Sequence, residues 1–479
     1  MESIYSPDSS DEDRRVRVNL LTLAIVVLVT SRAQSQTRTL TPDQALGREI
    51  LAELIGINTT FEHGSTTPAA EAVARRLVAA GFPAADVQVV GPTEKDKNLV
   101  ARLRGTGKRR PILLLAHLDV VEALRSDWSM DPFTLTERDG YFYGRGTSDI
   151  KGMAAIFVAT LIRLKRERVA LDRDLILALE SGEETDGGGI RWLLSARRDL
   201  IDAEYCINGD AGDPLQENGR PVVRSVQASE KVYHDLRLEV HNPGGHSSLP
   251  VADNAIYRLA AALERLAAFR FPASLNPVTR AYFERVAATQ APDVAADMRG
   301  LLRDPPDSAA MERLSQRSPL FNSMLRTTCV ATRLEAGHAN NALPQTARAI
   351  VNCRMLPQDP VERVEAMLRR VVADSGVAVI PIDTPTPSPP SPITPEVFGP
   401  LERVTHQLWP GVPIIPSMET GATDGLFLRN AGMPVYGVSA IFMEANDIRA
   451  HGRDERIGVR EYYAGLEFTY RFVKALVTP

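Results

Sequence analysis

Short apolar runs alternate with helical segments along the first half of the chain, and this alternation restricts the fold more than any other feature. Residues 111–117, 175–179 and 205–208 are apolar runs bounded by turn residues, as expected for buried strands. Residues 149–166 and 191–198 lie between these runs and have the apolar spacing of helices. Strands that alternate with helices predict an α/β fold, with a mostly parallel sheet and helices on both of its faces.

The pattern changes near residue 229. Four expected strands and two expected helices follow, at residues 232–240, 254–269, 327–334, 347–355, 361–373 and 377–382. Their order is β-α-β-β-α-β, which is typical of an inserted α+β domain. Residues 273–322 are rich in Pro, Ala and Arg, so we expect this stretch to be irregular.

The sheet domain is expected in two pieces. A proline-rich linker occupies residues 384–392, and the helix–strand pattern returns from about Glu396. We therefore assign residues 40–228 and 386–479 to the sheet domain and residues 229–385 to the inserted domain. At roughly 100–200 residues per domain, a chain of 479 residues is long enough for this arrangement.

The first 33 residues have the parts of a secretory signal peptide. A basic stretch at residues 14–17 precedes an apolar run at residues 20–30, and residues 31–33 place small side chains at a cleavage site. The apolar run is shorter than the roughly 20 residues that a membrane span needs. We expect an exported, periplasmic or secreted protein that has no stable membrane span after cleavage; an uncleaved N-terminal anchor is the alternative.

Composition and missing motifs argue against several other classes of protein. The formal net charge is −5, whereas proteins that depend on phosphate contacts are strongly basic, so we expect no nucleic-acid partner. Three cysteines are too few for a disulfide framework and allow at most one pair. The sequence contains no HExxH, Walker or GxSxG motif, so zincin, nucleotide-binding and serine-hydrolase chemistry lack their usual residues.

Acidic and histidine residues follow three of the expected strands. His117 and Asp119 end the first strand, Glu183 and Glu184 follow the second, and Asp210 follows the third. Ligands of open α/β sheets bind beside the carboxyl ends of the strands. Carboxylates that gather there repel one another, and a divalent cation removes that cost. Mixed histidine and carboxylate ligands suit zinc, or less specifically cobalt or manganese.

Two further candidates come from a loop–helix junction and a late loop. Asp149 begins a helix after a Gly-Arg-Gly-Thr-Ser stretch, and His451 lies in Ala-His-Gly-Arg-Asp-Glu. Each residue alone has an ordinary explanation, as a helix cap or a loop histidine. Asp213 is a weaker rival for the role of Asp210. The occurrence of all these residues in order is what favours a metal site.

Five ordered motifs give the chain a resemblance to a known enzyme family. The motifs are His117-Leu-Asp119-Val-Val, Tyr143-Gly-Arg-Gly-Thr-Ser-Asp149-Ile-Lys-Gly, Ser181-Gly-Glu183-Glu184, Asn208-Gly-Asp210 and His451-Gly-Arg-Asp-Glu455. They resemble those of the dinuclear zinc metallopeptidases that include carboxypeptidase S, glutamate carboxypeptidase, aminoacylase and succinyl-diaminopimelate desuccinylase. The stretch at residues 128–133 and the insertion at 273–322 are most similar to the carboxypeptidase S branch, which also includes hydrolases of N-acyl amino acids.

The resemblance implies two divalent metal ions per chain, most simply zinc. Asp149 would bridge them, with His117 and Asp210 on one side and Glu184 and His451 on the other. Which pair serves which ion stays open.

The resemblance also assigns residues to the reaction. Glu183 would be the general base that acts on a metal-bridging water, and it would deliver the proton to the leaving amine. Asp119 would orient His117.

The resemblance also implies roles for the inserted domain, as a lid and a dimerisation domain. His246, in Pro-Gly-Gly-His-Ser-Ser, would stabilise the oxyanion, while Asn341 and Arg354 would bind the carboxylate of the substrate. The loop Gly421-Ala422-Thr423 would contact the substrate in the sheet domain. A homodimer through the inserted domain is expected, and whether His246 serves its own subunit or a neighbour stays open.

These observations predict a metal-dependent hydrolase that cleaves amide bonds next to a free carboxylate, as a carboxypeptidase, a dipeptidase or an N-acyl amino acid hydrolase. One alternative is an aminopeptidase, which needs acidic residues to hold a free amine; Arg354 argues against it. The other is a binding protein that keeps the fold without catalysis; the presence of Glu183 argues against that alternative.

Overall fold

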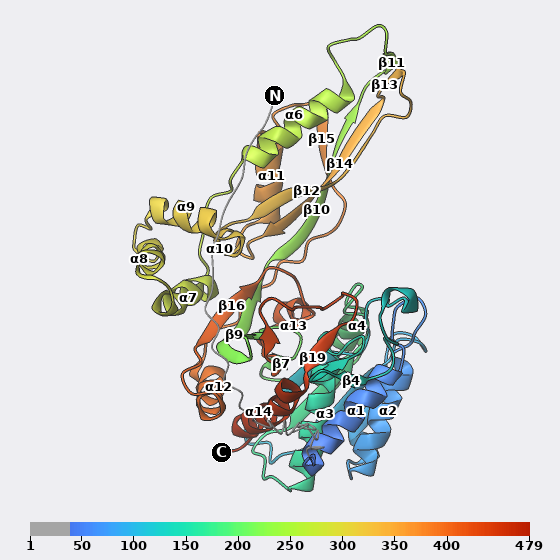
Figure 1. The fold of residues 1–479 in the computed structure, drawn as a ribbon, viewed down its shortest axis with the longest axis vertical. Coiled ribbons are helices and arrows are strands. Elements are labelled where there is room, and N and C mark those ends of the chain that lie inside the picture. Colours follow the sequence, from blue (N-terminus) through green and yellow to red (C-terminus); the bar gives the residue numbers. More distant parts are fainter. Residues whose placement is uncertain (1–38) are drawn as a thin grey trace, which may run out of the picture. The chain divides into compact units, whose positions relative to one another are not determined.

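The computed structural model describes residues 39–479 (Figure 1). The expected signal peptide at residues 1–33 lies outside the described residues. Among residues 39–479, we find no helix whose length and apolar character would let it cross a bilayer.

A ten-stranded sheet forms the larger part of the fold. Its central strands lie side by side and run parallel: β6 (Leu175–Glu180), β3 (Ile112–His117), β7 (Cys206–Asn208) and β17 (Val435–Gly437). At one edge, β2 (Asn98–Leu103) and β1 (Val87–Val90) pair antiparallel. The mainly parallel sheet confirms the predicted α/β class.

The other edge combines segments from before and after the insertion. These strands are β8 (Pro214–Glu217), β9 (Arg220–Glu230), β16 (Ile414–Glu419) and β18 (Met443–Glu444). β16 pairs parallel with β9 although almost two hundred residues separate them. The chain therefore leaves this sheet after β9 and returns to it at β16.

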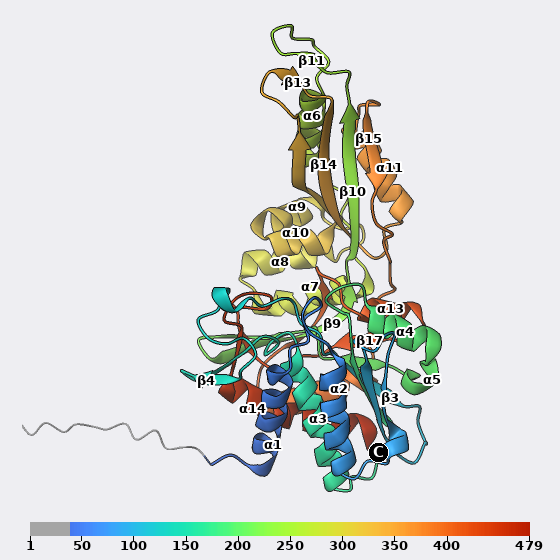
Figure 2. The same ribbon diagram turned by 90° about the vertical axis from the view of Figure 1, so that its right-hand side faces the viewer.

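Helices cover both faces of the large sheet. Alternate side chains of a strand point to opposite faces, so each buried strand contacts both layers of helices. Leu114 of β3 packs with α1 (Pro42–Gly56), α3 (Lys151–Arg166) and α14 (Val459–Val477). Its neighbours Leu113 and Leu115 pack with α4 (Gly188–Ala196) and α13 (Gly425–Asn430). Figure 2 shows α2 (Thr67–Ala79) beside α1 and α3. The other helices of this part are α5 (Arg198–Ile201) and α12 (Pro395–Leu408). A small separate sheet contains β4 (Thr136–Arg138), β5 (Tyr141–Tyr143) and β19 (Arg456–Gly458).

The inserted domain has the predicted β-α-β-β-α-β order. Its elements are β10 (Val232–His241), α6 (Ala255–Ala268), β12 (Thr328–Ala336), β14 (Thr346–Met355), α11 (Val361–Val372) and β15 (Val377–Pro381). The four strands form an antiparallel sheet in the order β12-β14-β10-β15. Two short strands, β11 (Gly245–His246) and β13 (Ala342–Leu343), pair at the end of β10 that is far from β9 (Figure 1).

The expectation that residues 273–322 are irregular is wrong. Most of this stretch is helical and belongs to four consecutive helices: α7 (Pro277–Val286), α8 (Pro292–Leu301), α9 (Ser308–Arg317) and α10 (Pro319–Leu325). Three of them begin with a proline at the first helical position, where its missing N–H is not needed. The side chains of Asn276, Asp307 and Ser318 cap three helices. The prolines therefore start helices here.

Two of the three cysteines form a disulfide within the inserted sheet. Cys329 of β12 and Cys353 of β14 are directly paired across the two strands and are bonded. Cys206 is buried in the large sheet as a free thiol.

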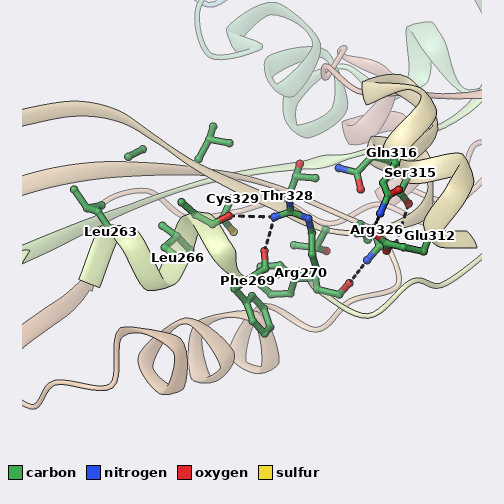
Figure 3. Close-up of a pocket in the computed structure, with 16 residues that line it drawn as sticks. Leu263, Leu266, Phe269, Arg270, Glu312, Ser315, Gln316, Arg326, Thr328 and Cys329 are labelled. Atoms are coloured by element: carbon green, nitrogen blue, oxygen red, sulfur yellow. Dashed lines mark hydrogen bonds and ion pairs between the residues drawn. The ribbon is translucent and has the colours of Figure 1, made fainter. Parts of the chain in front are cut away.

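The inserted domain also contains a cavity of about 520 Å³ between the end of α6, α9 and β12 (Figure 3). Apolar residues such as Leu266 and Phe271 line it together with Arg270 and Arg326. None of the candidate site residues lines this cavity.

Candidate active site

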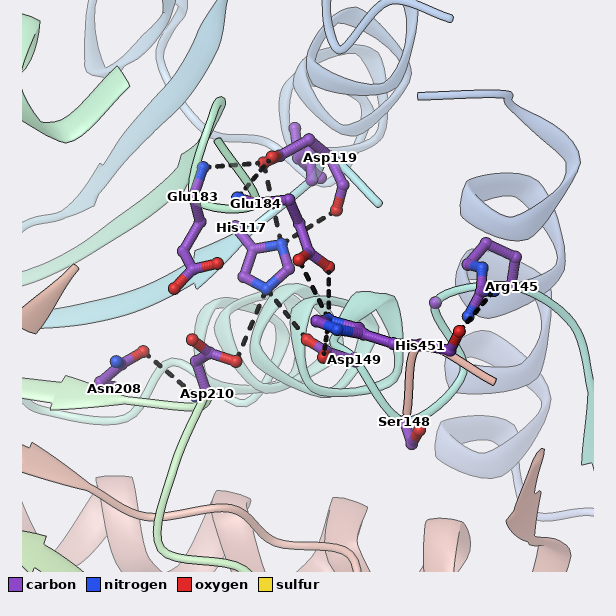
Figure 4. A network of polar contacts seen from close by, with 12 residues as sticks. His117, Asp119, Arg145, Ser148, Asp149, Glu183, Glu184, Asn208, Asp210 and His451 are labelled. Carbon is purple, nitrogen blue, oxygen red and sulfur yellow. Dashed lines mark hydrogen bonds and ion pairs between the residues drawn. The ribbon is translucent and has the colours of Figure 1, made fainter. Parts of the chain in front are cut away.

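The carboxyl ends of three parallel strands bring the candidate ligands together. β3 ends at His117, the loop after β6 carries Glu183 and Glu184, and Asp210 follows β7. These strands are parallel neighbours, so their ends lie at the same edge of the sheet. Asp149 reaches the same point from the residues just before α3, and Figure 4 shows all these side chains converging.

Asp149 lies between the two histidines of the cluster. Its Oδ1 atom is 3.1 Å from Nε2 of His117, and its Oδ2 atom is 3.0 Å from Nε2 of His451. Asp210 is 3.5 Å from His117 on one side, and Glu184 is 3.0 Å from His451 on the other. The geometry thus divides the ligands into two groups that share Asp149.

The main-chain carbonyl of Asp119 fixes the orientation of the His117 ring. Nδ1–H of His117 donates to this oxygen at 2.9 Å, so that Nε2 faces the carboxylates of Asp149 and Asp210 at 3.1 and 3.5 Å. We expected the carboxylate of Asp119 to orient the ring, but that group lies 3.7 Å from Nδ1. It accepts hydrogen bonds from the backbone N–H groups of Glu183 and Glu184, at 3.4 and 3.0 Å. Asp119 therefore positions the loop that carries both glutamates.

Among the described residues, the carboxylates of the cluster are not neutralised by lysine or arginine, so cations could balance their charge. Within residues 39–479, no Lys or Arg forms an ion pair with Asp149, Glu183, Glu184 or Asp210. Burial and the nearby Asp210 raise the pKa of Glu183 to about 10, and burial raises the pKa of Asp210 to about 7. Hydrogen bonds with Asp149 and Glu184 raise the pKa of His451 to about 10.

The donor atoms fit divalent metal ions. The ring of His117 also lies close to carboxylates from both of the groups that share Asp149: one ligand atom each from His117, Asp149 and Glu184, and one each from His117, Glu183 and Asp210, lie within 4.8 Å of one another. Imidazole nitrogens and carboxylate oxygens are ligands that zinc prefers. Bound cations would offset the mutual repulsion of the carboxylates and lower their pKa values.

The cluster is more exposed to solvent at His451 than at His117. The side chain of His451 is 55% exposed, whereas that of His117 is 1% exposed. A small cavity of about 90 Å³ adjoins Asp149 and Asp210 and is also lined by Asp213 and Ile448. Asp213 belongs to neither group of ligand atoms.

Glu455 is a site residue to which sequence reasoning assigned no role. It is fully buried and pairs with Arg145 at 2.7 Å. Its carboxylate accepts backbone hydrogen bonds from Gly146, Ser148 and Asp149, at 2.7 to 3.1 Å. Glu455 thus holds the loop that presents Asp149. The sequence contained a hint of this contact, because Arg145 and Glu455 lie in the same motifs that contain Asp149 and His451.

The structure does not bring His246 and Asn341 to the cluster. Both lie in or beside the β11–β13 pair, beyond the distal end of β10. Ten residues of β10 separate that end from the β9 junction, which is about 33 Å of extended strand. Nδ1 of His246 instead lies 2.7 Å from the hydroxyl of Ser248.

Arg354 lies near the other end of the inserted sheet, close to the junction. It pairs with Tyr233 across β14 and β10, and its guanidinium lies 4.6 Å from the centre of the Tyr233 ring. No carboxylate among the described residues forms an ion pair with it. The guanidinium is therefore free of internal salt bridges within this part of the chain.

The loop after β16 presents two of its three candidate residues. Gly421 and Ala422 are exposed, whereas Thr423 is buried. Both the N–H and the hydroxyl of Thr423 donate to Oε2 of Glu230, each at 3.1 Å. Contrary to the expectation, Thr423 is engaged within the protein and is not turned toward a ligand.

Comparisons with known proteins show the family of this chain. The model of the peptidase family M20/M25/M40 matches residues 113–475. The N-fatty-acyl-amino acid synthase/hydrolase PM20D1 of Bos taurus is 30% identical over 377 residues, which cover 76% of this chain and 74% of that protein.

Solved structures share the fold. The M20 family metallo-carboxypeptidase Sso-CP2 from Sulfolobus solfataricus has a TM-score of 0.65 at 18% identity, covering 90% of this chain and 99% of that one. The YXEP protein of Bacillus subtilis, described as a dinuclear metal binding peptidase from the M20 family, has a TM-score of 0.56 at 12% identity, covering 91% and 98%.

Proposed function

The chain belongs to the peptidase family M20/M25/M40 and is a metal-dependent hydrolase of amide bonds, and we propose that the amine it releases is an amino acid with a free carboxylate. Substrates would be dipeptides, peptide carboxy-termini or N-acyl amino acids. The hydrolytic chemistry rests on the position of Asp149 between two histidine–carboxylate pairs, with Glu183 beside them, and the carboxylate preference rests on Arg354 near the junction of the two sheets.

We propose that the cluster holds two zinc ions, with cobalt and manganese as the alternatives. Asp149 would be shared, His117 and Asp210 would hold one ion, and Glu184 and His451 the other. When bound, the ions would polarise the amide carbonyl. They would also lower the pKa of a water molecule, so that it loses a proton more readily and attacks the carbonyl carbon.

Glu183 is the proposed general base and acid. Its carboxylate lies in the same group of ligand atoms as His117 and Asp210, so it borders the place where the carbonyl carbon would be attacked. Nearby cations would lower its pKa from the raised value and keep it ionised at neutral pH. Glu183 takes a proton from the attacking water and returns it to the amine nitrogen as the C–N bond breaks. The products are a carboxylic acid and a free amino acid.

Arg354 is the proposed partner of the substrate carboxylate. It has no ion pair among the described residues and lies near the junction of the two sheets. A guanidinium binds a carboxylate through two parallel hydrogen bonds. An aminopeptidase would require acidic residues to hold the free amine of its substrate, and Arg354 favours the opposite polarity.

The inserted domain, residues 229–385, is proposed to be a lid that acts between two copies of the chain. The length of β10 keeps His246 about 33 Å from the β9 junction of its own chain. We therefore propose a homodimer in which His246 of the partner subunit completes the site together with Asn341 of the partner subunit. Mixing inactive Glu183→Gln and His246→Ala chains would then restore activity. No restoration, with mixed dimers verified, would contradict action across subunits.

We also propose that the protein is exported after cleavage at residue 33. The disulfide between Cys329 and Cys353 supports this proposal, because such bonds persist mainly in oxidising compartments.

The experiment that tests the proposed activity compares matched substrates. The chain from Gln34 would be loaded with zinc and assayed on dipeptides and N-acyl amino acids, each beside its carboxamide. We expect release of free amino acid from the acids, at least about tenfold slower turnover of the carboxamides, and loss of activity in Glu183→Gln. Equal rates on acids and carboxamides would exclude the carboxylate preference, and an active Glu183→Gln would exclude the mechanism.

A further inference from the structure

The chain crosses from the large sheet into the inserted sheet at Glu230. β9 ends at this residue, and β10 begins at Val232. Beside it, Glu419 at the end of β16 pairs with Glu230, and the N–H of Lys231 donates to the carbonyl of Glu419 at 2.9 Å. The loop that carries Gly421 and Ala422 therefore leaves β16 next to the point where the inserted domain starts.

The carboxylate of Glu230 anchors this loop through hydrogen bonds. Oε2 accepts hydrogen bonds from the N–H and the hydroxyl of Thr423, each at 3.1 Å, and from Nε2 of Gln227 at 3.0 Å. The other carboxylate oxygen forms an ion pair with Arg429 of α13. Glu230 and Arg429 are each 3% exposed, so the pair is shielded from solvent.

The same network reaches the segment by which the chain returns from the inserted domain. Nε of Arg429 donates to the hydroxyl of Ser388 at 3.3 Å, and Ser388 is buried in the proline-rich segment between β15 and α12. One buried ion pair thus connects the outgoing crossing, the returning crossing and the loop after β16. A movement of the inserted domain at either crossing acts on this pair.

We propose that Glu230 is a positioning residue that sets the loop at residues 420–424 and couples its position to the inserted domain. The proposal rests on the proposed function and, in addition, assigns Gly421 and Ala422 to substrate contact, as the family resemblance implies. Because Thr423 gives both of its donors to Glu230, the exposed backbone of the neighbouring Gly421 and Ala422 is held in a fixed position. A substrate would then bind against a preformed loop whenever the orientation of the inserted domain keeps the ion pair between Glu230 and Arg429 intact.

The test uses variants that weaken this link in two ways. Glu230→Gln removes the charge that Arg429 needs, and Thr423→Val removes one hydrogen bond while keeping the shape of the side chain. Glu230→Gln combined with Arg429→Met removes both charges, so that no buried charge is left unpaired. Arg173→Met serves as a matched control, because Arg173 is also buried with acidic partners, but it lies just before β6, at the amino end of that strand and away from the cluster at the carboxyl ends.

A positioning role and a purely structural role give different kinetics. If Glu230 positions the loop, KM should rise about tenfold in Thr423→Val and in the double variant, with kcat within about twofold and metal content unchanged. A structural role alone would lower the active fraction, and therefore the apparent kcat, while KM stays constant. Arg173→Met should show that second behaviour. An unchanged KM in Thr423→Val and in the double variant would overturn the proposal.

Amide hydrogen exchange tests the coupling without any substrate. In Glu230→Gln we expect faster exchange both at residues 421–425 and at residues 386–391, with exchange in α3 unchanged. Faster exchange at only one of these segments would overturn the coupling. This measurement also separates the two proposals: a chain that hydrolyses no carboxylate-bearing amide would refute the proposed function, whereas the exchange pattern would still decide the role of Glu230.

Discussion

Asp149 is the residue on which the arrangement of the metal cluster depends. Each of its carboxylate oxygens faces a different histidine, and each histidine has a further carboxylate partner. Both groups of ligands therefore depend on the single carboxylate of Asp149.

Replacing Asp149 by Asn should lower metal affinity and activity together. We expect at least about a hundredfold loss in both, because an amide is neutral and its nitrogen cannot replace the carboxylate oxygen that faces the second of the two proposed cations. Metal content after dialysis and the rate of hydrolysis measure the effect. Asp213→Asn is the matched control, since Asp213 lines the adjoining cavity but lies outside both ligand groups. If Asp213→Asn lost the metal and Asp149→Asn kept it, the assignment of the ligands would be wrong.

The raised pKa values of Glu183 and Asp210 predict how pH affects the metal-free chain. Both groups titrate near pH 4 in an unfolded chain, but burial raises their pKa values to about 10 and about 7 in the folded chain. Below about pH 4 both states are protonated and the groups have no effect on stability. Above it the unfolded state binds fewer protons, so the free energy of unfolding falls as pH rises.

Zinc should therefore raise the melting temperature more at about pH 8 than at about pH 5, because it binds the deprotonated groups. Thermal unfolding with chelator and with zinc at several pH values measures this difference. A difference that shrinks as pH rises would contradict the expected proton release.

Among the structural elements, the strand ends were the part that the sequence revealed best. Parallel strands place whatever follows them at one edge of the sheet, so the positions of His117, Glu184 and Asp210 could be anticipated from local patterns. The helices within residues 273–322 were missed, because proline starts a helix as readily as it ends one and local composition does not distinguish the two.

The role of Thr423 could not be anticipated, because its partner Glu230 lies almost two hundred residues away. The same applies to the His117 ring, whose orientation depends on a main-chain carbonyl of Asp119 and not on the carboxylate that the pattern suggested.

The loop before α3 is the element that presents Asp149, and Glu455 determines its shape. Glu455→Gln should weaken metal binding by about 10-fold to 100-fold, because a neutral side chain satisfies fewer of the N–H groups and leaves Arg145 without its charge partner. A zinc titration that follows activity measures the change. Glu461→Gln is the control, since Glu461 accepts hydrogen bonds from Arg460 and Gln216 instead. Equal zinc affinities in both variants would refute the role of Glu455.

At the scale of the whole molecule, a buried lysine marks the junction of the two sheets. Nζ of Lys231 donates to the hydroxyl of Ser323 at 3.1 Å and to the carbonyl of Arg326 at 2.9 Å. Burial and the nearby Arg354 lower the pKa of Lys231 to about 7. Protonating the side chain of Lys231 therefore costs free energy in the folded protein, at the point where the inserted domain begins.

Lys231 should make the protein more stable as pH rises from about 7 to about 10. An unfolded lysine titrates near 10.4, so in this window the unfolded state binds more protons than the folded state, and the free energy of unfolding rises by up to about 1.4 kcal/mol per pH unit. Lys231→Met should remove this contribution, which unfolding at several pH values would reveal as a smaller slope. An identical slope in both proteins would mean that Lys231 is not neutralised on folding.

In the proposed reaction, two cations at the cluster and Glu183 together hydrolyse the amide bond. This proposal is tested most directly by titrating zinc into the metal-free chain while following hydrolysis of an N-acyl amino acid or dipeptide that the wild type cleaves. We expect activity to reach a plateau at two zinc ions per chain, and Glu183→Gln to bind the same two ions but stay inactive. Full activity in the metal-free chain, or in Glu183→Gln, would contradict the proposal.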